Sequence, residues 1–182
     1  MRWLAVLAFI PAVAHADFTF KVPPGWTDLS PNAPAANFAK IEPVLAAQFR
    51  QATYTFFAAD LDGRGDGFME NVNATVYPKP HAINLAELKE IGEQIDAEVK
   101  KVDPRFSMQI LDTKVVKIGG VECGRYIGLL TMGDKVVQQI SYLLPGRNEH
   151  AVLTYSTVPA QFKRYQPVFD AAAKATVGIA PR

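Results

Sequence analysis

Apolar residues recur at helical spacing in two long segments of the chain. The clearer segment, residues 85–102, aligns these residues on one helix face: Leu88, Ile91, Gly92, Ile95 and Val99. Asn84 is a favourable N-cap with Glu87 three residues after it, and Asp103-Pro104 ends the segment. A helix with one apolar face must pack on another element, and we expect the flanking strands to be its platform.

The second helical segment, residues 159–177, closes the chain. Its apolar face is formed by Phe162, Tyr165, Phe169, Ala172 and Ala173. Pro167 lies inside this segment. Because proline removes a backbone donor from a helix, we expect a kink or a restart at this position.

The segments between these helices predict a run of three or four strands, and the later ones alternate apolar and polar residues, as strands with one buried face do. They are residues 106–118, 121–132, 135–144 and 149–157. The connections between them are short and contain glycine, so successive strands are expected to pair antiparallel. The predicted core positions of the last two strands are Ile140, Tyr142, Leu144, Ala151, Leu153 and Tyr155.

The N-terminal part of the chain contains shorter elements. Residues 18–22 alternate as an edge strand and end at a Pro-Pro-Gly-Trp turn, residues 23–26. Residues 38–49 repeat apolar positions every four residues and predict a short helix, although a proline lies inside it. Residues 52–59 and 68–77 favour strands, and the glycine-rich loop between them predicts an antiparallel hairpin.

Together these elements predict an α+β fold. We expect an antiparallel sheet of about six or seven strands with helices packed on its faces, an α/β/α sandwich. Residues 17–182 have the size of one ordinary domain, and no internal repeat or low-complexity segment divides them.

Residues 1–16 have the features of a secretory signal peptide. Arg2 precedes an uninterrupted apolar run, and Ala14-His15-Ala16 forms an A-x-A cleavage site. The apolar run is shorter than the roughly 20 residues that span a bilayer. We therefore expect a mature protein that begins at Asp17 and is soluble, in the periplasm or secreted, with no membrane span after cleavage.

The charge balance argues against nucleic acid and membrane surfaces as partners. The chain has 19 Lys and Arg against 18 Asp and Glu, and loss of Arg2 with the leader brings the net formal charge to zero. Proteins that bind either surface normally show a basic excess or a polybasic run. Cys123 is the only cysteine, so an internal disulfide is impossible and the apolar core must stabilise the fold.

Several local sequences resemble the PsbP-like family, which includes extrinsic photosystem subunits and the bacterial DcrB-like proteins. The matching sequences are Val22-Pro-Pro-Gly-Trp26, Phe68-Met-Glu-Asn-Val-Asn73, the Gly119-Gly120 hairpin, the strands with Tyr142 and Tyr155, and Tyr165-Gln-Pro-Val-Phe169. They cover nearly all of residues 17–182 and are fold signatures without catalytic residues. The resemblance implies a PsbP-like fold and a non-enzymatic binding, assembly or chaperone-like function.

The glycine-rich loop invites a metal hypothesis. Its acidic residues, with one from the strand that follows, are Asp60, Asp62, Asp66 and Glu70. Calcium prefers several carboxylate oxygens on a bending loop, but the EF-hand pattern fails here at Arg64 and at Asn71, where the bidentate glutamate belongs. A solvated hairpin tip explains the sequence better, and an ion at Asp60, Asp62 and Asp66 remains the alternative.

No motif for catalysis or for a cofactor is visible, and none is predicted. His81 and His150 are separate, without a second cysteine to build a zinc site, and both are expected at the surface. Cys123 with His150 has the residue types of a nucleophile and its base, but apolar neighbours favour a core position for Cys123. The phosphate-loop and Gly-x-Ser-x-Gly patterns are absent from the sequence.

Two functions therefore stay open. The first is an exported, non-enzymatic module that recognises a protein or peptide partner, with Trp26, Tyr54 and Phe57 as candidate contacts should a sheet face be left uncovered. The second is a small-ligand or metal-ion binding protein, or an enzyme, whose site is assembled from distant residues. The second requires the acidic residues and histidines above to converge on one concave site.

Overall fold

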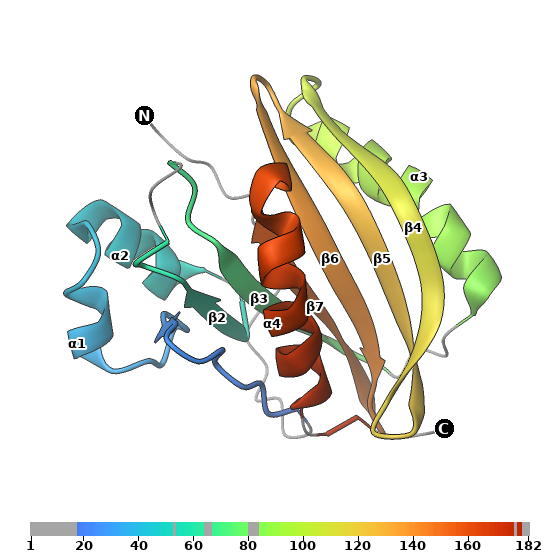
Figure 1. Cartoon of the computed structure of the whole chain (residues 1–182), viewed down its shortest axis with the longest axis horizontal. Helices are drawn as coiled ribbons and strands as arrows, with labels where there is room; N and C mark the ends of the chain where they lie inside the picture. The colour runs from blue at the N-terminus through green and yellow to red at the C-terminus, as the bar shows by residue number, and fades with distance from the viewer. Residues whose placement is uncertain (1–17, 53, 64–66, 80–83, 177, 180–182) are drawn as a thin grey trace.

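A computed structural model describes residues 18–52, 54–63, 67–79, 84–176 and 178–179. The predicted leader, Asp66 and His81 lie outside these residues. The described chain forms a seven-stranded sheet with helices on both faces (Figure 1), which confirms the predicted α+β fold. No helix in the described part of the chain combines the length and apolar character needed to cross a bilayer.

The sheet has the strand order β1-β2-β3-β7-β6-β5-β4, and each neighbouring pair is antiparallel. The strands are β1 (Thr27–Asp28), β2 (Phe56–Ala59), β3 (Asn71–Pro78), β4 (Phe106–Ile118), β5 (Val121–Met132), β6 (Lys135–Pro145) and β7 (Glu149–Thr157). The predicted hairpin between β2 and β3 and the predicted run of four later strands are therefore confirmed. The Gly119-Gly120 turn joins β4 to β5, and both glycines have positive φ, which a side chain would strain.

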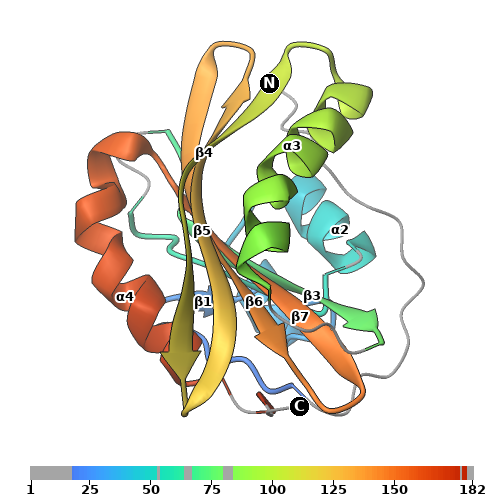
Figure 2. The same ribbon diagram turned by 90° about the vertical axis from the view of Figure 1, so that its right-hand side faces the viewer.

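Helix α4 (Phe162–Lys174) covers one face of the sheet, preceded by a single 3-10 turn, η2 (Pro159–Gln161). The opposite face carries α3 (Leu85–Val102) and, over β2, the two short helices α1 (Ala35–Phe38) and α2 (Pro43–Gln51) (Figure 2). In Figure 1 the pair α1 and α2 stands to one side, away from both long helices.

The main core lies between the sheet and α4. All five predicted helix positions and all six predicted strand positions are buried there: Phe162, Tyr165, Phe169, Ala172, Ala173, Ile140, Tyr142, Leu144, Ala151, Leu153 and Tyr155. Helix α4 runs without interruption through Pro167, so the predicted restart at this position is wrong. Pro167 and Lys163, whose carbonyl loses its helical donor, are both exposed, so water can take that hydrogen bond.

Helix α3 packs on β4 and β5 through the predicted apolar row. Leu88 and Val99 are buried, and Asn84 caps the helix by accepting a hydrogen bond from the N–H of Ala86 at 2.9 Å. Leu88 lies directly over Gly124 on β5: a Cβ at position 124 would stand 2.7 Å from Leu88 Cδ2. The absence of a side chain at Gly124 therefore sets how closely α3 approaches the sheet.

Strand β4 contributes residues to the main core under α4 and to the smaller core under α3, which contains Leu88, Tyr126 and Leu143. It does so because its register shifts between Ile110 and Asp112. Before this bulge, Ile110 packs with the core under α3. After it, Val116 and Ile118 pack with the main core. An extra residue in one strand reverses the side-chain alternation beyond it. The bulge thus lets one edge strand bury apolar residues on both faces in turn.

Two predictions for the N-terminal region are wrong. Residues 18–22 form no regular strand, although Phe18 and Phe20 pack into the main core; the edge strand forms after the turn, at Thr27–Asp28. Residues 38–49 are not one helix. Pro43 begins α2 instead of lying within a helix, as suits its fixed φ and missing N–H, and the chain turns between α1 and α2.

Candidate functional site

The two short helices form a lobe with its own hydrophobic core. This lobe core consists of Leu29, Phe38, Ile41, Phe57, Ala59 and Leu61. Strand β2 separates it from the main core, because Phe57 and Ala59 face the lobe while Phe56 and Ala58 face α4. The lobe is therefore a distinct packing unit attached to the end of the sheet.

Hydrogen bonds to β1 and β2 fix the lobe in place. The Leu29 N–H donates to the carbonyl of Phe57 at 2.8 Å, and the Asn37 side-chain amide donates to the carbonyl of Asp28 at 2.9 Å. On α2, the Phe49 ring packs on the Phe57 ring with centroids 4.4 Å apart. These contacts position α1 and α2 side by side.

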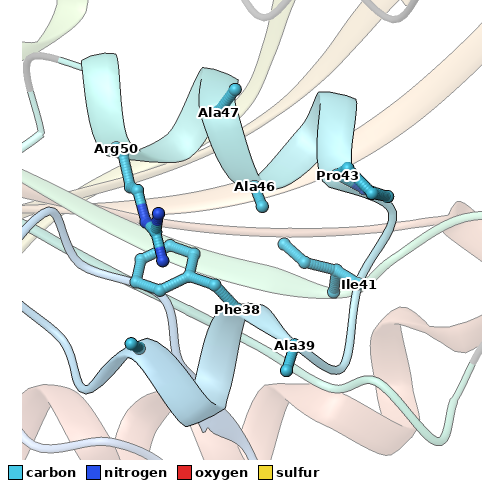
Figure 3. Close-up of a pocket in the computed structure, with 8 residues that line it drawn as sticks. Phe38, Ala39, Ile41, Pro43, Ala46, Ala47 and Arg50 are labelled. Carbon is cyan, nitrogen blue, oxygen red and sulfur yellow. The ribbon is translucent and has the colours of Figure 1, made fainter.

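An open groove of about 500 Å³ lies between α1 and α2 (Figure 3). We call it the α1–α2 groove; its lining residues are Ala35, Phe38, Ala39, Ile41, Pro43, Ala46, Ala47 and Arg50. Pro43, Ala46, Ala47 and Arg50 follow one another at spacings of three and four, so they share one face of α2. Seven of these eight lining residues have apolar side chains, and the charged one, Arg50, lies at one end of the groove.

Arg50 supplies that charged group. Its Cζ lies 4.6 Å from the centroid of the Phe38 ring, so a cation–π contact holds the guanidinium beside the groove (Figure 3). It is the only charged residue among the described residues that line the groove, and no described acidic side chain forms an ion pair with it. Its donors are therefore available to an incoming carboxylate.

Helix α2 exposes apolar surface beside the groove. None of its residues is buried, and Val44 is 69% exposed, the largest value among the exposed large hydrophobic residues. Leu45, Ala46 and Phe49 are only half-buried against the lobe core. Helix α2 therefore leaves part of its apolar face open to solvent.

The predicted partner residues do not gather on one surface. Trp26 packs edge-on against Tyr165 and Phe169, with ring centroids 6.2 and 6.1 Å away, at the edge of the main core. Tyr54 is half-buried against Phe57, and Phe57 is buried in the lobe core, close beneath α2. Two of the three thus support the lobe from inside, and the third lies on the other face of the sheet.

The acidic loop is organised by hydrogen bonds within the protein. Asp60 Oδ1 accepts from the N–H groups of Asp62 and Gly63, each at 3.1 Å, and its Oδ2 accepts from the Tyr165 hydroxyl at 2.9 Å. Glu70 is fully buried, with Oε1 accepting from Thr157 at 3.1 Å. Within the described ranges, no group of three or more His, Cys, Asp or Glu side chains is placed to hold a metal ion.

The other candidate residues lie apart. His150 stacks on Tyr77 at one end of β3, about 20 Å along the strand from Asp60 at the other end. Cys123 is fully buried in the main core, and burial raises the pKa of its thiol to about 11, so it is protonated at neutral pH. A protonated, buried thiol is a poor nucleophile.

The sequence reading missed the groove and also two polar pairs on the α4 face. Arg125 Nη2 donates to Asp112 Oδ2 at 2.6 Å just beyond the β4 bulge, and Tyr142 donates from its hydroxyl to Asp170 on α4. Burial, aided by the hydrogen bond to Asp170, raises the pKa of Tyr142. The one sequence signal for the groove was the alanine-rich stretch around Pro43. Because this stretch does not alternate apolar and polar residues, it did not indicate a surface groove.

Comparison with known proteins identifies the fold of the chain. No protein-family model and no curated protein sequence matches the chain. Among solved structures, it is similar to cyanobacterial PsbP (CyanoP) from Synechocystis sp. PCC 6803, with 15% identity, a TM-score of 0.58, and coverage of 94% of this chain and 98% of that one. It is also similar to LpqN of Mycobacterium tuberculosis, involved in cell envelope biogenesis, with 14% identity, a TM-score of 0.50, and coverage of 88% and 82%. At these identities the likeness establishes architecture, and the chain has the PsbP-like fold that its sequence resembles.

Proposed function

We propose that this protein is an exported, non-enzymatic binding or assembly module that holds a protein or peptide partner at the α1–α2 groove. The observation that carries the proposal is helix α2, which has no buried residue and presents Val44, 69% exposed, beside an apolar groove. The PsbP-like fold supports this class of function by analogy, since PsbP is an extrinsic subunit in the family resemblance above. The leader-like residues 1–16 support export.

The alternative of a ligand-binding protein or enzyme has less support. Its candidate residues in the described chain, Asp60, Asp62 and His150, do not converge on one concave site. An active site needs several polar groups within hydrogen-bond reach of one substrate position. Among the described residues that line the groove, only Arg50 supplies a charged group.

Site-specific photo-crosslinking tests the proposal. Benzoylphenylalanine placed at Val44 is expected to capture a protein partner in cells that express the full chain. Val102 is a matched control, since it is an exposed valine at the end of another helix, α3. An adduct at Val44 that is absent at Val102 is the expected result, and no adduct at Val44, or equal adducts at both positions, contradicts the proposal.

The export part is tested separately. N-terminal sequencing of the protein from the exported fraction is expected to begin at Asp17. Protein that keeps its leader and stays in the cytoplasm contradicts it.

A further inference from the structure

We infer that the α1–α2 groove receives an amphipathic α-helix of a protein partner, with aliphatic side chains in the groove and a carboxylate on Arg50. This inference rests on the proposed function and specifies the chemistry of the partner. Three features of the lobe lead to it: the openness of the groove, the elements that line it, and the position of its one charge.

The open shape of the groove selects a macromolecule over a small ligand. Small-molecule sites enclose most of their ligand, whereas this groove of about 500 Å³ is open to solvent between two helices. Val44 lies outside the lining and is 69% exposed, so the apolar surface continues past the groove over α2. Only a partner with surface of its own can cover both the groove and Val44.

The lining elements select a helix over an extended strand. A partner strand binds by hydrogen bonds to an unpaired sheet edge. The eight lining residues that the structure describes belong to α1, α2 and the turn between them, and none of these eight lies on a strand. A groove between helices instead accepts the side chains of a third helix, which are spaced at i, i+3 or i+4, and i+7.

The length of α2 sets the size of the contact. Its nine residues extend about 13 Å at 1.5 Å per residue, which matches two to three turns of a partner helix. Small side chains at Ala46 and Ala47 allow bulky aliphatic side chains to enter between α1 and α2. We expect leucine, isoleucine or methionine as the entering residues.

The position of Arg50 sets the charge of the partner. The guanidinium stands over Phe38 at one end of the groove, and Pro43 marks the other end (Figure 3). A guanidinium binds a carboxylate through charge-assisted hydrogen bonds. The partner helix should therefore carry Asp or Glu at one end of its apolar row.

Peptide selection tests this inference. A phage library of random peptides, long enough for about four helical turns, is selected on the mature protein and counter-selected on Ala47→Trp, which fills the groove. Enriched peptides are expected to show aliphatic residues at helical spacing followed by Asp or Glu, and to gain helical circular dichroism on binding. Enriched peptides that are extended, or that bind Ala47→Trp equally well, overturn the inference.

The charge is tested on one enriched peptide in a double-mutant cycle. Arg50→Gln is expected to weaken binding about tenfold, and replacing the peptide's acidic residue by its amide should remove the difference between the two proteins. Lys163→Gln, which removes a positive charge from the exposed side of α4, is the matched control and should leave the affinity unchanged. Equal affinity of wild type and Arg50→Gln overturns the role of Arg50.

The outcomes separate this inference from the proposed function. If crosslinking occurs at Val44 but the selected peptides are not helical, or bind independently of Arg50, the helical-partner inference is refuted and the proposed binding function is retained. Failure of both crosslinking and selection refutes both. Thermal unfolding of Ala47→Trp and Arg50→Gln verifies that each variant is folded before binding is compared.

Discussion

The hydroxyl of Tyr142 on β6 donates a hydrogen bond to Oδ1 of Asp170 on α4, and so ties the helix to the sheet from within the main core. Tyr155 stands edge-on to Tyr142, with ring centroids 6.2 Å apart. The carboxylate of Asp170 also acts electrostatically on Tyr155. Burial is the main cause that raises the pKa of both phenols, and the negative charge of Asp170 raises each further. Ionisation of either tyrosine would place two negative charges close together in the core.

Alkaline pH is therefore expected to destabilise the fold. The pKa values of all six tyrosines are raised, that of Tyr165 to about 12, while in the unfolded chain they return to about 10. The folded state then holds more protons above pH 10, so stability is full below that pH and falls as pH rises. The expected slope is about 1.4 kcal/mol per pH unit for each retained proton.

Urea unfolding and phenolate absorbance, each measured through this alkaline range, check the expectation. Tyr165→Phe is expected to reduce the slope by at most one proton's contribution. Phenolate absorbance that appears near pH 10 while the protein is still folded would refute the burial argument.

The contact between Leu88 and Gly124 predicts a non-additive pair of substitutions. Gly124→Ala places a methyl group 2.7 Å from Leu88 Cδ2 and is expected to cost about 1–3 kcal/mol. Leu88→Ala removes a buried side chain and is expected to cost about 2–5 kcal/mol. The double variant should be less destabilised than the sum by at least about 0.5 kcal/mol, because Leu88→Ala makes room for the methyl group.

Gly128 provides the control on the same strand. A Cβ there meets Met108 Sδ at 2.9 Å and not Leu88, so Gly128→Ala and Leu88→Ala should add. Denaturant unfolding measures all five variants. Additivity at Gly124 would show that α3 shifts as a whole instead of yielding at Leu88.

The pair Asp112 and Arg125 should respond asymmetrically to substitution. The Arg125 side chain is 9% exposed and that of Asp112 is 46% exposed. Asp112→Ala leaves a buried guanidinium without its carboxylate and is expected to cost about 1.5–3 kcal/mol of unfolding free energy. Arg125→Met leaves a carboxylate that water can solvate, so it should cost no more than about 1 kcal/mol.

Lys114 serves as the reference for this pair. Its Nζ lies 4.0 Å from the same Asp112 Oδ2 but is exposed, so Lys114→Met should change stability by less than about 0.5 kcal/mol. Equal losses for Asp112→Ala and Arg125→Met would contradict the asymmetry.

The acidic loop should behave as a hydrogen-bonded turn. Asp60→Ala removes acceptors from two backbone N–H groups and from Tyr165, and is expected to cost about 1–3 kcal/mol. Asp62→Ala, at an exposed position, should stay within about 0.5 kcal/mol. We expect millimolar calcium to leave the Tm unchanged, because both Asp60 oxygens already accept hydrogen bonds. A calcium-dependent rise in Tm that Asp62→Ala abolishes would support a metal site.

Much of the sandwich follows from sequence because its strands and helices obey simple periods. The alternation of Ile140, Tyr142 and Leu144 fixed the core face of β6, and the row from Leu88 to Val99 fixed the inner face of α3. The Gly119-Gly120 pair marked the turn between β4 and β5, and the single Gly133 marked the turn between β5 and β6; all three have positive φ. In each case one local pattern determines one structural outcome.

The lobe resisted prediction because its geometry depends on long-range packing. Pro43 looks like a helix breaker within residues 38–49, yet it begins α2, and long-range contacts such as that of Phe49 with Phe57 on β2 fix the helix in place. The β4 bulge is likewise invisible in sequence, since the alternation of residues 106–118 gives no sign that the register shifts between Ile110 and Asp112. The groove exists only once α1 and α2 are placed side by side.

The separateness of the lobe core has a consequence for motion. Since none of the residues of α2 is buried, its amides should open and exchange with deuterium far sooner than those of the central strands, without unfolding of the sandwich. A ligand seated between α1 and α2 would slow that exchange locally. Under the proposed function, recognition and rigidity would therefore belong to different parts of the chain.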